Sequence, residues 1–191
     1  MASQPFPFLN AEQYLEIERA AEYKSEYWKG EMFAMAGATR PHNLIAGNTF
    51  GQIRGQLRGK PCETYTSDMR VLAAKIGFYA YPDVVILCGS PQFPEHRQDT
   101  LLNPTVVIEV LSPSTEAYDR GRKFERYRTI DSLRQYLLLA QDRAQADLFT
   151  RRAEGPWVLT SCSGREDFVD LESVGCRLSL AECYERVEFP D

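Results

Sequence analysis

Two acidic residues, Asp83 and Glu109, occupy strand-like apolar runs at residues 83–88 and 105–111. Because Glu109 has apolar neighbours on both sides, its strand is expected to be buried on both faces, where an ionised carboxylate is costly unless it is compensated. Consecutive strands are neighbours about two-thirds of the time, so the two carboxylates are expected to meet on one side of a sheet. Their oxygen atoms are ligands that Mg²⁺ or Mn²⁺ prefers. The pattern therefore predicts a divalent-metal site.

A lysine in the following basic segment is the third candidate. Residues 116–130 are expected to form a helix, and on a helical wheel Lys123 shares the inward arc with Tyr127, whereas Arg122 and Arg126 point outward. An inward ammonium group beside two carboxylates can orient a water molecule and offset charge that builds up on a phosphate. A metal ion would add Lewis acidity and a more acidic bound water. Together, these groups are suited to hydrolysis of a phosphodiester.

Each of these three residues also has an ordinary structural explanation. Asp83 follows a proline, which is typical of a turn, and Glu109 could belong to a buried ion pair. Lys123 could simply extend its methylene groups over the core and reach water. Their occurrence together and in this order nevertheless favours a functional site.

Weaker candidates lie elsewhere in the chain. Glu31, on an early strand, could be a further metal ligand, although a surface charge on a hairpin explains it equally well, and Glu26 is a weaker candidate of the same kind. His42 lies at the edge of the apolar arc of a helix and is more typical of a structural histidine than of a substrate contact. Asp68 could hydrogen-bond within the site, but a turn residue is the simpler interpretation. Asp119 is expected to form an ordinary helical ion pair with the lysine four residues later.

The chain as a whole predicts a single α/β or α+β domain over residues 1–191, with a mixed β-sheet flanked by helices. The expected elements are a helix from residue 11, a hairpin at 24–36 turning at Lys29 and Gly30, a helix at 41–57, strands at 62–65, 69–74 and 78–81, a loop at 89–103, strands at 134–140, 146–151, 157–160 and 168–171, and a helix at 180–187. The strands at 157–160 and 168–171 are expected to pair. Glycines 47, 51 and 55 could permit close packing of their helix.

Composition excludes several classes of protein. The net charge of -5 counts against avid non-specific binding of nucleic acid, although residues 119–134 carry a local basic surplus. No apolar run approaches the roughly 20 residues that span a bilayer, and the first residues lack the features of a signal peptide, so the protein is expected in the cytoplasm. The five cysteines are odd in number and contain no C-x-x-C pair, which indicates buried free thiols rather than disulfides or a structural zinc site.

Three segments carry a resemblance to a known family: Tyr81-Pro82-Asp83-Val84, Ile108-Glu109-Val110-Leu111, and residues 119–127. The chain resembles the Uma-two family of restriction endonucleases, a branch of the PD-(D/E)XK nuclease superfamily. The resemblance implies a restriction-endonuclease-like core in which Asp83 and Glu109 bind Mg²⁺. Leu111 stands where the superfamily has its catalytic lysine, and Lys123 is the matching residue on the following helix.

The resulting hypothesis is a metal-dependent endonuclease that acts on DNA, with Asp83 and Glu109 holding Mg²⁺ or Mn²⁺ and Lys123 acting on water or on the transition state. Two alternatives stay open. One is a catalytically weak or inactive nuclease-fold protein that binds nucleic acid or a protein partner, which the acidic net charge and Leu111 favour. The other is a small-molecule phosphodiesterase. Superfamily habit and exposed strand edges suggest a homodimer, and no membrane partner is expected.

Overall fold

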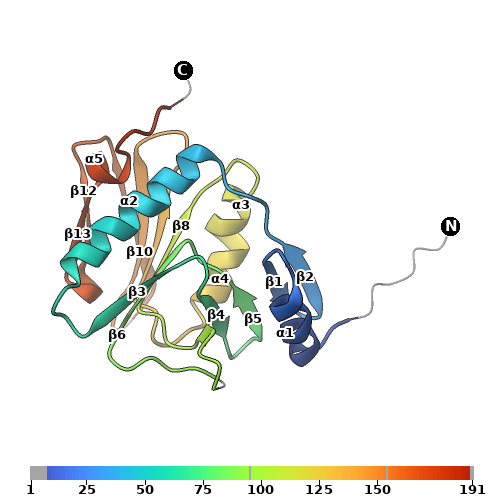
Figure 1. The fold of residues 1–191 in the computed structure, drawn as a ribbon. Helices are drawn as coiled ribbons and strands as arrows, with labels where there is room; N and C mark the ends of the chain where they lie inside the picture. Colours follow the sequence, from blue (N-terminus) through green and yellow to red (C-terminus); the bar gives the residue numbers. More distant parts are fainter. Residues whose placement is uncertain (1–7, 95, 154, 190–191) are drawn as a thin grey trace.

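A six-stranded mixed sheet forms the centre of the computed structural model, which describes residues 8–94, 96–153 and 155–189 (Figure 1). Its strands are β3 (Cys62–Thr66), β6 (Val84–Cys88), β8 (Val106–Val110), β9 (Gln135–Leu139), β10 (Gln145–Arg151) and β11 (Trp157–Ser163). Their order across the sheet is β11-β10-β9-β8-β6-β3, in which β8 and β9 are parallel and the other pairs are antiparallel. The mixed α+β fold predicted from the sequence is therefore confirmed.

Both faces of this sheet are covered (Figure 1). One face packs against α2 (Arg40–Gln56), α5 (Leu180–Cys183) and a hairpin of β12 (Phe168–Leu171) and β13 (Cys176–Ser179). The other face packs against α4 (Phe124–Tyr127) and against strands of a second sheet; α4 follows α3 (Glu116–Tyr118) and a π-helical turn (Asp119–Lys123). Ile86 and Ile108 face the first group, whereas Val85 and Val107 face the second, because side chains alternate along a strand. Burial on both faces explains the unbroken apolar sequence of β6 and β8.

A second, five-stranded sheet contains the N-terminal hairpin. Its order is β2-β1-β5-β4-β7, with β1 (Ser25–Trp28), β2 (Glu31–Ala34), β4 (Arg70–Ala73), β5 (Phe78–Ala80) and β7 (Thr100–Leu101). The β1–β2 hairpin turns at Lys29 and Gly30, as predicted, and both have positive φ angles of 50° and 88°. Helix α1 (Ala11–Ala20) begins at a capping box formed by Asn10 and Gln13, and its Tyr14 packs against the hairpin.

Several predicted details of the fold are wrong. Strand β12 pairs with β13 rather than with β11, because the chain reverses through a short 3₁₀ turn (Glu172–Val174) and Gly175. Helix α5 ends at Cys183, before residue 187, and the segment 89–103 contains the short strand β7 instead of being loop throughout. The glycines at 47, 51 and 55 lie on the exposed face of α2 with open space around them, so they do not permit close packing.

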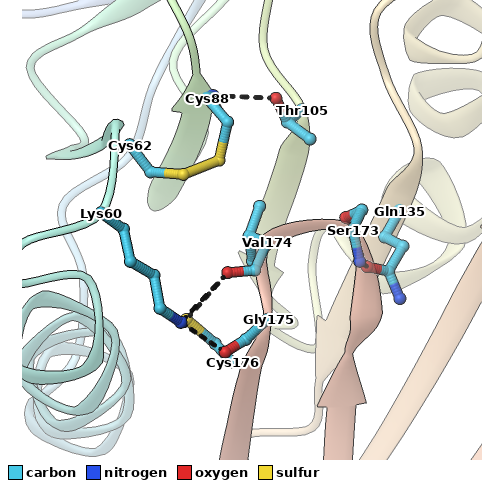
Figure 2. Close-up of a disulfide and its surroundings, with 9 residues drawn as sticks. All are labelled: Lys60, Cys62, Cys88, Thr105, Gln135, Ser173, Val174, Gly175 and Cys176. Atoms are coloured by element: carbon cyan, nitrogen blue, oxygen red, sulfur yellow. Dashed lines mark hydrogen bonds between the residues drawn. A yellow bond between two sulfur atoms is a disulfide. The ribbon is translucent and has the colours of Figure 1, made fainter.

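The prediction that all cysteines are free is also wrong. Cys62 and Cys88 lie directly opposite each other on the antiparallel strands β3 and β6 and form a disulfide (Figure 2). Cys162, Cys176 and Cys183 are free. The pairing could not be seen in the sequence because the two residues are 26 positions apart and meet only when the strands pair.

Two features of the structure concern the predicted cytoplasmic location. Disulfides are rare in cytosolic proteins, so the Cys62–Cys88 disulfide gives this location no support, and it stays a prediction. Among the described residues, no helix has the length and apolar character needed to cross a membrane.

Candidate active site

The paired strands β6 and β8 bring Asp83 and Glu109 together. The antiparallel register places Val84 opposite Ile108. Asp83, which immediately precedes β6, is therefore opposite Glu109, and the two side chains share the face that looks towards α4. The backbone N–H of Val110 donates to Oδ2 of Asp83 over 2.7 Å, which holds this carboxylate beside β8. The structure thus has the neighbouring carboxylates that the sequence predicts.

The side chain of Lys123 lies among carboxylates from three segments of the chain. Its Nζ is 2.9 Å from Oε1 of Glu109, 2.9 Å from Oε1 of Glu26 and 3.5 Å from Oδ1 of Asp119. The hydroxyl of Tyr127 donates to the same Oε1 of Glu109 over 3.1 Å. Lys123 faces inward, as the wheel predicts, and the expected helical pair with Asp119 is also present. We call these five residues the lysine cluster.

The π-helical turn changes the helix register that the wheel assumes, because such a turn adds a residue to one helical turn. Arg126, predicted to point outward, is instead buried. Its guanidinium lies 3.8 Å from the ring centroid of Trp28 and donates to the hydroxyl of Tyr118 over 2.7 Å. That hydroxyl in turn donates to Oε2 of Glu26 over 2.8 Å. The outward prediction for Arg126 is therefore wrong, and this arginine supports a member of the lysine cluster.

Burial and neighbouring charges shift the pKa values within the lysine cluster. Burial raises the pKa of Glu109 well above its ordinary value; the ammonium of Lys123 opposes this rise, and the carboxylate of Asp83 adds to it. Burial by itself would lower the pKa of Lys123, but Glu109 and Glu26 outweigh it and raise the pKa well above the usual value. Lys123 is therefore a charged ammonium at neutral pH, held in place by carboxylates.

The three further candidates have different positions. His42, in the first turn of α2, contacts Asp83, with 3.0 Å between Nε2 and Oδ1. Glu31 is exposed and lines a cavity that Asp83, Glu109 and Lys123 also line, and among the described residues no hydrogen bond or ion pair joins it to the lysine cluster. Asp68 lies outside the cavity: it is an exposed turn residue that forms an ion pair with Lys24. The turn interpretation of Asp68 is the one that fits the structure.

Sequence reasoning ranked Glu26 too low and missed Tyr118 as its neighbour in the site; it placed Tyr127 on the inward arc but did not assign its hydrogen bond to Glu109. Glu26 lies inside the fold and contacts the lysine, although it was considered only as a weak metal ligand. One signal was available, because alternation along β1 places Glu26 and Trp28 on one face and Tyr27 on the other. Tyr118 could not be assigned without the contact between the hairpin and α3, which joins residues 92 positions apart.

The site residues line one cavity of about 1070 Å³ between the β1–β2 hairpin and the segment that contains α3 and α4. Asp83, Glu109 and Lys123 belong to its lining, together with Glu26 and His42. Its volume is slightly above the usual range for ligand pockets, which is about 300–1,000 Å³. The cavity therefore joins a carboxylate pair, a buried ammonium and room for a sizeable substrate.

The donor atoms in this cavity suit a hard divalent cation. Mg²⁺ is commonly held by one or two carboxylates and keeps its remaining positions for water and substrate phosphate oxygens. Asp83 and Glu109 offer such a pair, opposite each other and on the cavity lining. In the described parts of the chain, no group of three His, Cys, Asp or Glu side chains is arranged to hold an ion. A metal would thus depend on the two carboxylates together with water or substrate.

Comparison with known proteins shows where the chain belongs. The family model “Uma2: Putative restriction endonuclease” matches residues 11–181, which is most of the sequence. The chain belongs to the Uma2 family. The resemblance carried by the segments around Asp83, Glu109 and Lys123 is therefore confirmed, and the family description supports nuclease chemistry in general terms.

Individual relatives extend this finding. The uncharacterized protein slr1290 of Synechocystis sp. is 34% identical over 189 residues, which cover 98% of this chain and 97% of the relative. A second Synechocystis protein, sll1609, is 35% identical over 163 residues, which cover 85% of this chain and 92% of the relative. The crystal structure of a “putative nuclease belonging to DUF820” from Anabaena variabilis superposes with a TM-score of 0.74 over 94% of this chain and 99% of that chain. At 15% identity, this similarity shows a shared fold.

Proposed function

We propose that the protein is a divalent-metal-dependent nuclease that hydrolyses phosphodiester bonds of DNA in this cavity. One observation carries the proposal: Asp83 just before β6, Glu109 on β8 and Lys123 in the π-helical turn all line the cavity, with Lys123 Nζ 2.9 Å from Glu109. Family membership supports nuclease chemistry, and the two carboxylates support Mg²⁺ or Mn²⁺ as the cofactor.

Each side chain of the site has its own role in the proposed hydrolysis. Hydrolysis forms a bond from a water oxygen to phosphorus and breaks the bond from phosphorus to the leaving sugar oxygen, which then takes up a proton. Mg²⁺ or Mn²⁺ held by Asp83 and Glu109 would supply Lewis acidity and a more acidic bound water. The ammonium of Lys123 orients the water or offsets charge on the phosphate oxygens. His42 and the N–H of Val110 hold Asp83 in position.

A second candidate function is binding of nucleic acid without cleavage. The ammonium of Lys123 already contacts Glu26, Glu109 and Asp119, so its charge is compensated within the protein. A lysine used in this way can be purely structural. The two candidates differ in one outcome, because only the nuclease turns over substrate when Mg²⁺ or Mn²⁺ is present.

Cleavage of supercoiled plasmid DNA tests the proposal. We expect purified protein to nick the plasmid with Mg²⁺ or Mn²⁺ and not with EDTA. Asp83→Asn, Glu109→Gln and Lys123→Met are each expected to lower the rate by about 100-fold or more, in line with the loss of electrostatic stabilisation. Lys75→Met is the matched control, because Lys75 is 60% exposed and lies in the turn between β4 and β5. Cleavage that persists undiminished in the three site variants would refute the proposal.

A further inference from the structure

Two exposed aromatic side chains lie on the cavity lining, one on β2 and one in the segment between α1 and β1. Phe33 and Tyr23 line the cavity and are 43% and 64% exposed, and neither belongs to a hydrophobic cluster of the described residues. Phe33 is opposite Glu26 in the hairpin register, so its ring lies on the face that looks into the cavity. Trp28, on the same face, differs because Arg126 already stacks on its ring.

The cavity lining also presents a guanidinium group. Arg122 is exposed on the cavity lining, and it forms no ion pair with any residue that the structure describes. Its neighbours are engaged elsewhere, because Arg120 contacts Glu116 and Asp147 and Arg126 is buried. A free guanidinium is a good ligand for a phosphate group, because its fork of N–H donors matches two phosphate oxygens.

The charge of the cavity restricts the form of nucleic acid that can bind. The basic residues on its lining are Lys24, Arg122, Lys123 and Arg126, and acidic residues outnumber them. The whole chain is also acidic, with a net charge of -5. Intact duplex offers mainly phosphates to a protein, and affinity for it depends on many basic contacts. A single strand also offers the faces of its bases, which stack on aromatic side chains.

We propose that the cavity takes an unpaired, single strand of DNA, whose bases stack on Phe33 and Tyr23 and whose backbone phosphate pairs with Arg122. The inference rests on the proposed function, because it names the form in which the nuclease substrate is bound. One cavity lining thus combines aromatic side chains, a guanidinium group and the carboxylate pair, which match the base, phosphate and scissile bond of one strand. The acidic lining also implies that a divalent cation must be present before the strand binds.

Fluorescence anisotropy with a labelled 12-nucleotide DNA tests this inference. The same sequence is presented as a single strand and as a blunt duplex, with Ca²⁺ in place of Mg²⁺ to fill oxygen ligands while binding alone is measured. We expect the single strand to bind about tenfold or more tightly than the duplex. Phe33→Ala and Tyr23→Ala are expected to weaken single-strand binding by about tenfold each, the usual size of one lost stacking contact. EDTA is expected to abolish binding.

Two surface variants serve as matched controls. Phe168→Ala removes an aromatic side chain that is 47% exposed on β12, and Arg128→Ala removes an exposed arginine just after α4; neither lines the cavity. Both are expected to bind like the wild type, whereas Arg122→Ala is expected to bind more weakly and to reduce the dependence of affinity on salt. Equal or tighter binding of duplex, or equal effects of Phe33→Ala and Phe168→Ala, would overturn the inference.

The single-strand inference and the proposed nuclease function can fail independently of each other. A wild type that cleaves DNA but prefers duplex removes the single-strand inference and leaves the nuclease. A wild type that binds the single strand through Phe33 and Arg122 but shows no cleavage with Mn²⁺ removes the nuclease and leaves the binding mode.

Discussion

Lys123 is the central residue of the lysine cluster, and the proposed function also gives it a chemical role. It is 6% exposed and is the counter-ion for Glu26, Glu109 and Asp119. Removing one partner of a buried ion pair leaves an uncompensated charge, which costs far more than the net value of the pair. The geometry therefore couples loss of this lysine to loss of stability, in addition to any loss of activity.

We expect Lys123→Met to lower the free energy of unfolding by about 3–5 kcal/mol. Urea unfolding followed by circular dichroism measures this change, with Lys75→Met as the exposed control, which should change stability by about 0.5 kcal/mol or less. Adding Glu26→Gln and Glu109→Gln to Lys123→Met is expected to restore part of the stability, because the unpaired charges are removed. A stable single variant would show that the carboxylates do not depend on the lysine.

His42 is expected to act through Asp83, which it contacts at 3.0 Å. Partners that orient a ligand typically change metal affinity by about 10–100-fold when they are removed. We therefore expect His42→Ala to weaken Mn²⁺ binding by about tenfold or more in isothermal titration calorimetry. His96→Ala, an exposed histidine outside the cavity, is the control and should bind Mn²⁺ like the wild type. Equal affinities for the two variants would leave His42 without a role at the metal.

Some residues of the site could be predicted from the sequence and others could not. Asp83 and Glu109 could be placed because one precedes and the other belongs to a strand with a strong apolar pattern, and strands that follow one another in the sequence are often neighbours. For Glu26, alternation along β1 indicates only which face it lies on, because its burial depends on the hairpin folding against α3, a contact that no local pattern encodes. Arg126 was misplaced because the wheel assumes a regular α-helix, and nothing in the residue pattern marks the π-helical turn.

At the scale of elements, an ion-pair network ties α1 to the second sheet and so positions the hairpin wall of the cavity. Asp99 accepts from Nε of Arg19 at the end of α1 over 2.9 Å and lies 3.1 Å from Nη2 of Arg70 on β4. Burial by itself would raise the pKa of Asp99, but hydrogen bonds from Arg19 and Thr100 and the charge of Arg70 outweigh it and lower the pKa from 3.8 to about 2.

The sign of this shift predicts the effect of acid. Because the pKa of Asp99 is lower in the folded state, the carboxylate stabilises the fold above its unfolded value of 3.8, and the contribution is lost as pH falls towards 2. We expect Asp99→Asn to cost about 1 kcal/mol at neutral pH, since the side chain is partly exposed to solvent. Urea unfolding at several pH values should show this difference shrinking only below about pH 4. A difference that is the same at pH 2 and pH 7 would contradict the ion-pair assignment.

At the scale of the whole molecule, the overall layout was within reach of the sequence and the disulfide was not. Most strands and helices follow from apolar runs and turn residues, whereas β7, β13 and the division into separate sheets were not predicted, and Cys62 and Cys88 meet only in the folded sheet. Closing a loop across 26 residues removes chain entropy from the unfolded state. The disulfide ties strand β3, at the edge of the main sheet, to β6, which leads directly from Asp83.

We expect reduction of this disulfide to lower the free energy of unfolding by about 3 kcal/mol. Urea unfolding with and without a phosphine reductant measures the change, and thiol titration of the unfolded, unreduced protein should find the three free cysteines. Cys62→Ser should behave like the reduced wild type, whereas Cys162→Ser, which changes a free thiol, should keep the response to reductant. Five titratable thiols in the unreduced protein would contradict the pairing.

The most direct test of the proposed site is a crystal of the protein grown or soaked with Mn²⁺ and examined by anomalous diffraction. We predict one strong anomalous peak in contact with both Asp83 and Glu109, beside the Lys123 ammonium, and its loss in Asp83→Asn. Exposed carboxylates such as Asp68 should show no peak of similar height. A clear Mn²⁺ peak elsewhere, with Asp83 and Glu109 free of metal, would contradict the assignment of these carboxylates as the metal ligands.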